Sequence, residues 1–142
     1  MGVAEEQLIL SFIEYWKGPT QNAEGMSSMM AEDVIWHINM PLAKAIVGRE
    51  AARAEIERQN TISSGLLEGS KLLKILSDDE TVFTERIDIN AIRGRPVTFY
   101  INGVFEIRDG QISKWRDYFD TCDMVQKLGI PTGLDLSRIY PG

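Results

Sequence analysis

The sequence predicts an α+β fold in which helices come first and an antiparallel sheet follows. Apolar residues recur at helical spacing near the N-terminus. Four segments with the composition of strands then follow one another closely between Gly69 and Phe119. Because helices and strands are segregated along the chain instead of alternating, their order favours α+β architecture over a parallel sheet built from βαβ units.

Three helices are predicted before the sheet. The first spans Glu5 to Lys17, and Gly18-Pro19 ends its apolar periodicity. A short second helix is predicted around Glu24 to Ala31, where a cluster of methionines is interpreted as core packing rather than as a cofactor site. The third helix runs from about Arg49 to Thr61, and its many charged residues predict a mostly solvated face.

The strands are predicted from β-branched and aromatic residues between turn signals. Asp33 leads into VIWHINM, which suits a strand, and the loop PLAKAIVGRE follows. The joints Arg93-Gly94-Arg95-Pro96 and Asp109-Gly110 have the residues of hairpin turns. After the sheet, Thr121 to Leu128 is predicted as a short helix and the remaining tail as irregular. The four strands of the sheet are predicted at Lys71–Leu76, Thr81–Ala91, Val97–Arg108 and Gln111–Phe119.

Length and composition indicate a single globular domain over residues 1–142, with 44% hydrophobic and 25% charged residues. The net charge of -6 repels phosphate and anionic lipid, so neither nucleic acid nor a membrane is an expected partner. The N-terminal MGVAEEQ lacks the features of a signal peptide, which predicts a cytoplasmic protein. With one cysteine, Cys122, and one histidine, no internal disulfide or ordinary His/Cys zinc site is expected.

Charged residues occupy strand positions that ought to face the protein interior. In an extended segment, Asp117 lies on the same face as Trp115 and Phe119, and Arg86 shares a face with Asp88. If the sheet is curved and helices cover its concave side, these charges form the floor of an apolar pocket. The other walls would come from the same face of the neighbouring strand, with Phe99, Ile101, Gly103 and Phe105.

A second interpretation is a ladder of solvent-exposed ion pairs across the strands, worth a few tenths to about one kcal/mol each. The aromatic neighbours of Asp117 argue against it, because burying an unpaired carboxylate costs several kcal/mol. Arg86, placed between Asp88 and Asp117, is a suitable buried partner for both. Asn90, on the same face beyond Asp88, is interpreted either as a satisfied rim residue or as a contact to a hydroxyl-bearing substrate.

The segments TERIDI and VFEIRDGQISKWRDYFD, with Asn-Met-Pro inside VIWHINMPLAKAIVGRE, resemble the limonene-1,2-epoxide hydrolase family of the SnoaL/NTF2-like superfamily. The resemblance covers roughly residues 34–124. It implies an NTF2-like cone, in which a strongly curved mixed sheet and N-terminal helices close an apolar pocket. It also implies a cofactor-independent enzyme and a homodimer.

The resemblance also implies roles for individual residues. Asp117 matches the carboxylate that activates water, Asp88 the acid that protonates the epoxide oxygen, and Arg86 the guanidinium that bridges them. Asn39 matches a residue that holds the water. His37 stands where the family commonly has a second water ligand, a tyrosine, so it is interpreted either as a water ligand or as a structural histidine. Strand alternation, and not the resemblance, predicts the pocket lining of Phe99, Ile101, Trp115, Phe119 and Asn90, and Trp36, on the opposite face of its strand from His37, is expected in the core.

The function predicted is a cofactor-independent epoxide hydrolase that adds water to an apolar epoxide and gives a vicinal diol. General acid and base catalysis would act in one step, because the nucleophilic water must lose a proton and the departing oxygen must gain one. Two alternatives stay open: an isomerase or cyclase of the same fold that uses an Asp base, and a non-catalytic ligand-binding or dimerisation module.

Overall fold

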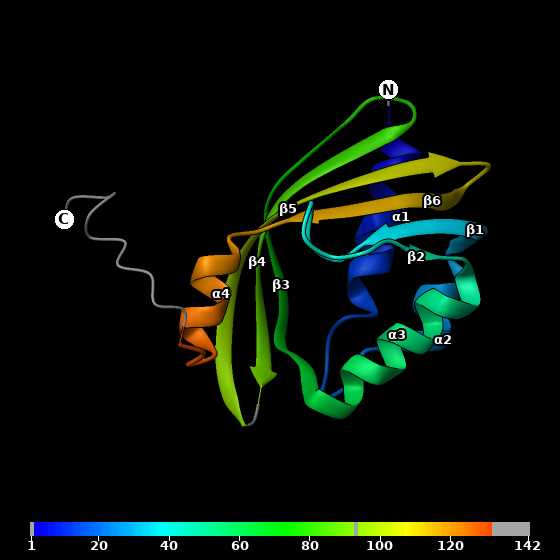
Figure 1. The fold of residues 1–142 in the computed structure, drawn as a ribbon. Coiled ribbons are helices and arrows are strands. Elements are labelled where there is room, and N and C mark those ends of the chain that lie inside the picture. The colour runs from blue at the N-terminus through cyan, green and yellow to red at the C-terminus, as the bar shows by residue number, and fades with distance from the viewer. Residues whose placement is uncertain (1, 93, 132–142) are drawn as a thin grey trace.

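We describe a computed structural model of the chain that covers residues 2–92 and 94–131, with only the backbone considered for residues 63–69. This part of the chain forms a six-stranded sheet and four helices (Figure 1). The helices are α1 (Val3–Glu14), α2 (Ala23–Ser28), α3 (Arg49–Ile62) and α4 (Thr121–Lys127). The strands are β1 (Met30–His37), β2 (Ile46–Val47), β3 (Ser63–Ser77), β4 (Thr81–Ile92), β5 (Arg95–Arg108) and β6 (Gln111–Tyr118).

The sheet is mixed, in the order β2-β1-β6-β5-β4-β3. Strands β3 to β6 form the predicted antiparallel meander, and β1 pairs with β6 in parallel. The long strands bend sharply, and α1, α2 and α3 lie on the same side of the sheet (Figure 1). Three shifts of register in the pairing of β3 with β4 provide a local cause for the bend, because β-bulges increase strand twist. The open, strongly curved sheet confirms the predicted fold class.

The hairpin between β5 and β6 turns where the sequence predicts it. Asp109 and Gly110 both have positive φ, 53° and 73°, the combination that a two-residue hairpin turn requires. The third helix and the helix after the sheet also form within one or two residues of their predicted ends. Residues 132–142, predicted as irregular, lie outside the described residues.

The boundary between α2 and β1 differs from the prediction. The helix ends at Ser28 instead of Ala31, because the Met29 carbonyl accepts a hydrogen bond from the Ile112 N–H and Met30 pairs with Ile112 on β6. The first strand therefore begins at Met30 and ends at His37, earlier than expected. Sheet pairing here overrides a local helical pattern.

Two further strand predictions are corrected. The predicted loop PLAKAIVGRE contains the short strand β2, which pairs with β1. Strand β3 begins at Ser63, eight residues before the predicted start at Lys71, and its first half pairs with the end of β4. The Gly- and Ser-rich composition of this segment hid the strand, since its extended backbone is stabilised by β4 and not by strand-forming side chains.

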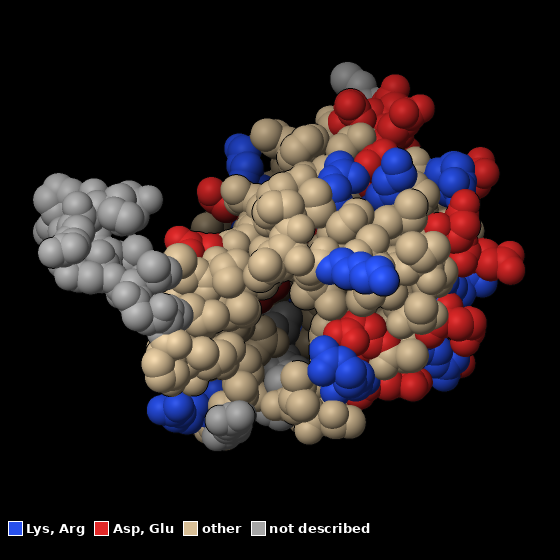
Figure 2. Space-filling model, in the orientation of Figure 1, with Lys and Arg blue, Asp and Glu red and all other residues tan. Residues whose placement is uncertain are grey.

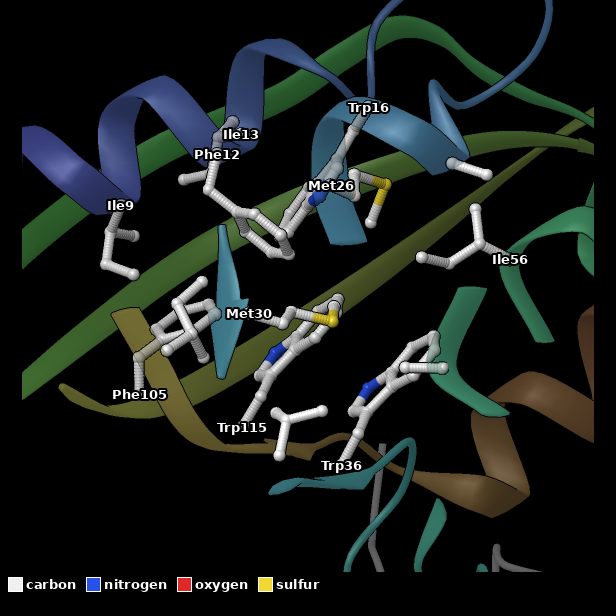
Figure 3. Packing of buried hydrophobic residues seen from close by; sticks show 14 of the residues in the cluster. Ile9, Phe12, Ile13, Trp16, Met26, Met30, Trp36, Ile56, Phe105 and Trp115 are labelled. Atoms are coloured by element: carbon white, nitrogen blue, oxygen red, sulfur yellow. The ribbon is translucent and has the colours of Figure 1, made fainter. Parts of the chain in front are cut away.

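The main core lies between the helices and the sheet, and aromatic rings dominate it (Figure 3). Phe12 of α1 packs edge-on against Trp16, Phe105 and Trp115, with ring centroids 5.2–6.2 Å apart. Trp36 of β1 stacks on Trp115 at 4.6 Å. Met26 and Met30 are fully buried in the same cluster, which confirms that the methionines are core packing. None of the helices in the described part of the chain is long and apolar enough to cross a bilayer.

Candidate active site

A cavity of about 220 Å³ opens on the concave side of the sheet. The face drawn in Figure 2 is hollowed near its centre, between the positions of α3 and α4 in Figure 1. Most of its walls are apolar, and its charged lining residues, among those described, are Arg86, Asp88 and Asp117. The five predicted pocket residues all line it: Asn90, Phe99, Ile101, Trp115 and Phe119.

Arg86 of β4 lies at the floor of the cavity and is 1% exposed. Its Nε donates to both carboxylate oxygens of Asp88, at 3.1 and 3.2 Å, and its Nη2 donates to Oδ2 of Asp117 at 2.8 Å. Its Nη1 donates to Thr84 Oγ1 at 3.1 Å, and the guanidinium carbon lies 4.9 Å from the ring centroid of Trp16. The guanidinium is thus held by both carboxyls and an aromatic face.

The two carboxyls are buried as well, with Asp88 6% and Asp117 7% exposed. Burial on this scale rules out the alternative of a solvent-exposed ladder of ion pairs. Asp88 also accepts a hydrogen bond from Ser70 Oγ at 2.7 Å, and Oδ1 of Asp117 accepts one from the Trp115 indole N–H at 2.9 Å. Each carboxyl is therefore oriented by two donors.

Gly103 makes the contact between Arg86 and Asp117 possible. These two residues lie on β4 and β6, with β5 between them, and Gly103 pairs with Thr84 on one side and with Asp117 on the other. A Cβ atom on Gly103 would lie 2.2 Å from Arg86 Nη1 and 2.8 Å from Asp117 Oδ1. The missing side chain leaves the space in which the guanidinium reaches across the intervening strand.

Burial and the ion pairs shift the pKa of each of these groups in opposite directions. Burial raises the pKa of Asp117, and the positive charge and hydrogen bond of Arg86 offset this only in part. Burial also disfavours the charge of Arg86, but Asp117 and Asp88 outweigh it and raise the pKa of the guanidinium. The site therefore holds a permanent cation next to a carboxyl that binds a proton more readily than an ordinary aspartate.

Asn39 lies next to the site but is not part of the cavity wall. The N–H of the following residue, Met40, donates to the Asp117 carbonyl at 2.8 Å, and Asn39 Nδ2 donates to Thr121 Oγ1 at 3.0 Å. The other atom of this buried amide, Oδ1, accepts no hydrogen bond from the described residues. An acceptor close to the Asp117 backbone is thus left available, and its role in holding water stays a prediction.

His37 is less closely associated with the site. It pairs with Arg116 on β6, while its neighbours Trp36 and Ile38 line the cavity. Alternation along the strand therefore directs its side chain to the other face. Its Nδ1 is buried and has no hydrogen-bond partner among the described residues. The structure gives no contact between His37 and the other candidate residues, and its role as a water ligand stays a prediction.

Some residues near the cavity were not predicted from the sequence. Trp36 was expected in the core alone, but it also lines the cavity, whereas Phe105 lies in the main core and not in the cavity wall. Helix α3 contributes Gln59 and Ile62, which lie one turn apart, and the segment after α1 contributes Gln21. The spacing of Gln59 and Ile62 on α3 could have predicted that they line the cavity together. Gln21 lies in a loop, where no sequence pattern predicts which way a side chain points.

Residues 13–129 match the family of limonene-1,2-epoxide hydrolase catalytic domains. The chain belongs to this family. It is 31% identical over 108 residues to epoxide hydrolase EphG of Mycobacterium tuberculosis, across 76% of this chain and 69% of that protein. The family assignment makes the chain an epoxide hydrolase of the limonene-1,2-epoxide hydrolase type, as the sequence motifs predicted.

Solved structures agree with the assignment. A limonene-1,2-epoxide hydrolase-like epoxide hydrolase from M. tuberculosis superposes with a TM-score of 0.75 at 27% identity, over 88% of this chain and 89% of that one. A protein of ketosteroid isomerase-like fold from Catenulispora acidiphila gives a TM-score of 0.76 at 15% identity, over 91% and 97% of the two chains. The second likeness shows the NTF2-like fold alone, so the epoxide hydrolase family is distinguished by its sequence and not by its fold.

Proposed function

We propose that this epoxide hydrolase adds water to a small, largely apolar epoxide in one step and gives a vicinal diol. Asp117 acts as the general base, Asp88 as the general acid, and Arg86 holds both. The observation that carries the proposal is the single buried guanidinium hydrogen-bonded to two buried carboxyls at the floor of an apolar cavity.

In the proposed step, Asp117 removes a proton from a water molecule as the water oxygen bonds to an oxirane carbon. The bond between that carbon and the oxirane oxygen breaks, and this oxygen takes the proton of Asp88. A positioned acid or base contributes about 10²–10⁴-fold each, so two acting together account for a large acceleration without a covalent intermediate. The two carboxyls exchange protonation states during the step, and the total charge does not change.

One proton shared by the two carboxyls makes the charges of the site balance. Arg⁺, one carboxylate and one carboxylic acid sum to zero, which an apolar cavity tolerates far better than a net charge. The raised pKa of Asp117 also suits a base, because a carboxylate of higher pKa accepts a proton more readily once it is ionised. Arg86 stays charged throughout, so it stabilises whichever carboxyl is ionised.

The nucleophilic water is assigned to the space between Asp117 and Asn39. The unpaired Oδ1 of Asn39 supports this, because a water that donates one proton to Asp117 can donate the other to this acceptor. Its lone pairs then remain free to attack carbon. His37 is a weaker candidate for the same water, since strand alternation directs its side chain to the face opposite Trp36, which lines the cavity.

The cavity indicates a small substrate. Its volume of about 220 Å³ lies below the roughly 300–1,000 Å³ of pockets for drug-sized ligands. Indole, phenyl and aliphatic side chains make up most of its walls. An isomerase or cyclase with an Asp base remains the second enzyme hypothesis for this fold, but an arginine shared by two carboxyls serves the double proton transfer of hydrolysis better than it serves an enolate.

The source of the new oxygen tests the mechanism. With enzyme in excess over epoxide in ¹⁸O-labelled water, the diol of the first turnover should carry the label, and the peptide containing Asp117 should carry none. A covalent mechanism predicts the opposite, because an Asp nucleophile gives one of its own oxygens to the product. Mass spectrometry of diol and peptide distinguishes the two. If the enzyme forms a diol from none of the epoxides in a structurally varied panel, the hydrolase proposal itself is contradicted.

A further inference from the structure

The cavity has uncharged polar lining residues as well as a charged floor. Three side-chain amides line it, Gln21, Gln59 and Asn90, and they come from the segment after α1, from α3 and from β4. All three are half-buried. The three amides come from separate elements, and no part of the proposed proton transfer uses them.

Hydrogen bonds fix two of these amides in place. Gln21 Nε2 donates to Gln59 Oε1 at 3.1 Å. The Gln21 backbone is held in turn by Asn60, whose Oδ1 accepts from the Gln21 N–H and whose Nδ2 donates to the Gln21 carbonyl, both at 2.9 Å. Asn60 does not line the cavity. Hydrogen bonds thus hold the segment after α1 against α3 at two points: the contact of Asn60 with the Gln21 backbone outside the cavity, and the Gln21–Gln59 pair inside it. We call the Asn60 contact the latch.

The described residues leave part of this amide group unpaired. Gln21 Oε1 accepts no hydrogen bond, and the Asn90 amide neither donates nor accepts one. Both residues line the cavity, and an apolar molecule bound there could not satisfy these atoms. An apolar ligand would leave these atoms without hydrogen bonds and would bind with a less favourable free energy. A ligand with its own hydrogen-bonding group avoids this loss.

The position of Asn90 sets the spacing between the two polar parts of the cavity. Asn90 follows Asp88 by two residues on the same face of β4, so it lies about 7 Å farther along the strand. That separation is close to the width of one saturated ring. A molecule whose oxirane meets Asp88 therefore presents the opposite side of its ring or chain to the amides.

We infer that Gln21, Gln59 and Asn90 form a subsite for a neutral hydrogen-bonding group, and that the substrate is an epoxide with a hydroxyl at the end remote from the oxirane. The inference rests on the proposed function, whose substrate it specifies further. The charged residues in the described cavity wall are Arg86, Asp88 and Asp117, which pair with one another, and Glu55, which accepts a hydrogen bond from Gln59 Nε2 at 3.5 Å, lies outside that wall. An ionised group therefore finds no unpaired opposite charge in this wall. A hydroxyl both donates and accepts, which matches a free amide oxygen and a free amide N–H.

Two epoxides of equal size test the inference: 1,2-epoxycyclohexane with a hydroxymethyl group at the 4-position, and the same ring with an ethyl group there. The wild-type enzyme should have the higher kcat/KM for the hydroxymethyl compound. Asn90→Leu should shift the ratio of the two kcat/KM values toward the ethyl compound by about tenfold or more, since it exchanges a hydrogen-bonding wall for an apolar one. Gln59→Leu should shift it in the same direction.

Two matched controls separate the subsite from general damage. Asn102→Leu makes the same exchange at an exposed position on the other face of the sheet and should leave the ratio unchanged. Asn60→Leu breaks the latch outside the cavity; if loosening of α3 caused the shift, this variant would reproduce it. A wild-type enzyme that does not prefer the hydroxymethyl compound, or an Asn90→Leu variant with the wild-type ratio, would overturn the inference.

A binding measurement keeps this test separate from the test of the reaction. All three tryptophans of the chain line the cavity, so their fluorescence reports ligand binding. The same two epoxides are titrated into Asp117→Asn, with and without Asn90→Leu, where turnover is not required. Tighter binding of the hydroxymethyl compound that Asn90→Leu abolishes supports the subsite even if no diol forms. Equal binding of both compounds rejects it even if both are hydrolysed.

Discussion

At the scale of single residues, the site depends on one guanidinium that serves two carboxyls. Arg86→Lys keeps the positive charge but loses the planar guanidinium with its several N–H donors. One ammonium group cannot donate to Asp88 and Asp117 in the same geometry. We expect turnover to fall by about 10²-fold or more. Arg116→Lys is the matched control, because Arg116 lies on the other face of β6 and pairs with Glu106. Near-normal turnover of Arg86→Lys in a steady-state assay would contradict the bridging role.

The pH dependence follows from the burial of Asp117. Its raised pKa means that the folded enzyme keeps this carboxyl protonated at pH values where an ordinary aspartate, with a pKa near 3.9, is already ionised. A base must be ionised, so kcat/KM should fall on the acid side with an apparent pKa above the ordinary value. Circular dichroism at each pH separates this loss from unfolding. An acid limb at or below the ordinary value would argue against Asp117 as the base.

The charged site and Asn90 could be predicted from the sequence, and the other two amides of the polar subsite could not. Arg86, Asp88 and Asp117 stand out because strand alternation places charges where an apolar face is expected, and the motifs around them are specific. Gln21 and Gln59 are ordinary residues of a loop and of a charged helix. Their position in the same cavity as Asn90 depends on how α3 and the segment after α1 fold over the sheet, which local pattern does not encode.

At the scale of secondary-structure elements, strand β5 acts as a spacer between the two strands that carry the charges. Gly103→Ala would place a methyl group 2.2 Å from Arg86 Nη1, so the guanidinium must move away from Asp117. We expect turnover to fall by about tenfold or more while the variant stays folded. A crystal structure should show a lengthened contact between Arg86 and Asp117. Gly110→Ala offers a contrast, since nothing lies within 4 Å of its added Cβ atom and its cost is limited to the positive φ of the turn.

The misplaced element boundaries share one physical cause. The end of α2 and the first half of β3 are determined by partners distant in sequence, Ile112 on β6 and the last residues of β4. Periodicity and composition report only on neighbours along the chain, so they locate α3 and the hairpins well and these two boundaries poorly. They also extend the first helix to Lys17, whereas α1 ends at Glu14. The parallel pairing of β1 with β6 also joins segments that are distant in sequence, so local patterns do not predict it.

At the scale of the whole molecule, the outer face of the sheet exposes large rings. Phe83, Tyr100 and Tyr118 are 55%, 63% and 41% exposed on β4, β5 and β6, and Glu85 and Arg116 lie close to them. An apolar patch with charges of both signs can pair with a copy of itself about a two-fold axis. We therefore expect a homodimer at micromolar concentration, measured by sedimentation.

Phe83→Lys should shift this equilibrium toward monomer, because it places a second cation near Arg116 and removes a ring from the patch. Leu42→Lys is the control, since Leu42 is 69% exposed but belongs to the loop before β2. A wild-type chain that sediments as a monomer at all accessible concentrations would contradict the expectation of a dimer.

The charged floor of the cavity comes from one short stretch of chain, the meander of β4, β5 and β6, whereas α3 and the segment after α1 supply two of the three amides, Gln59 and Gln21, and part of the wall. Apart from Asn90 on β4, the residues proposed for selectivity are thus encoded in other segments of the gene than the residues proposed for proton transfer. Random substitution confined to residues 18–22 and 56–62 should yield enzymes with altered substrate range and intact proton transfer. New substrate ranges can therefore arise from substitutions in α3 and in the segment after α1, while the charged floor stays unchanged.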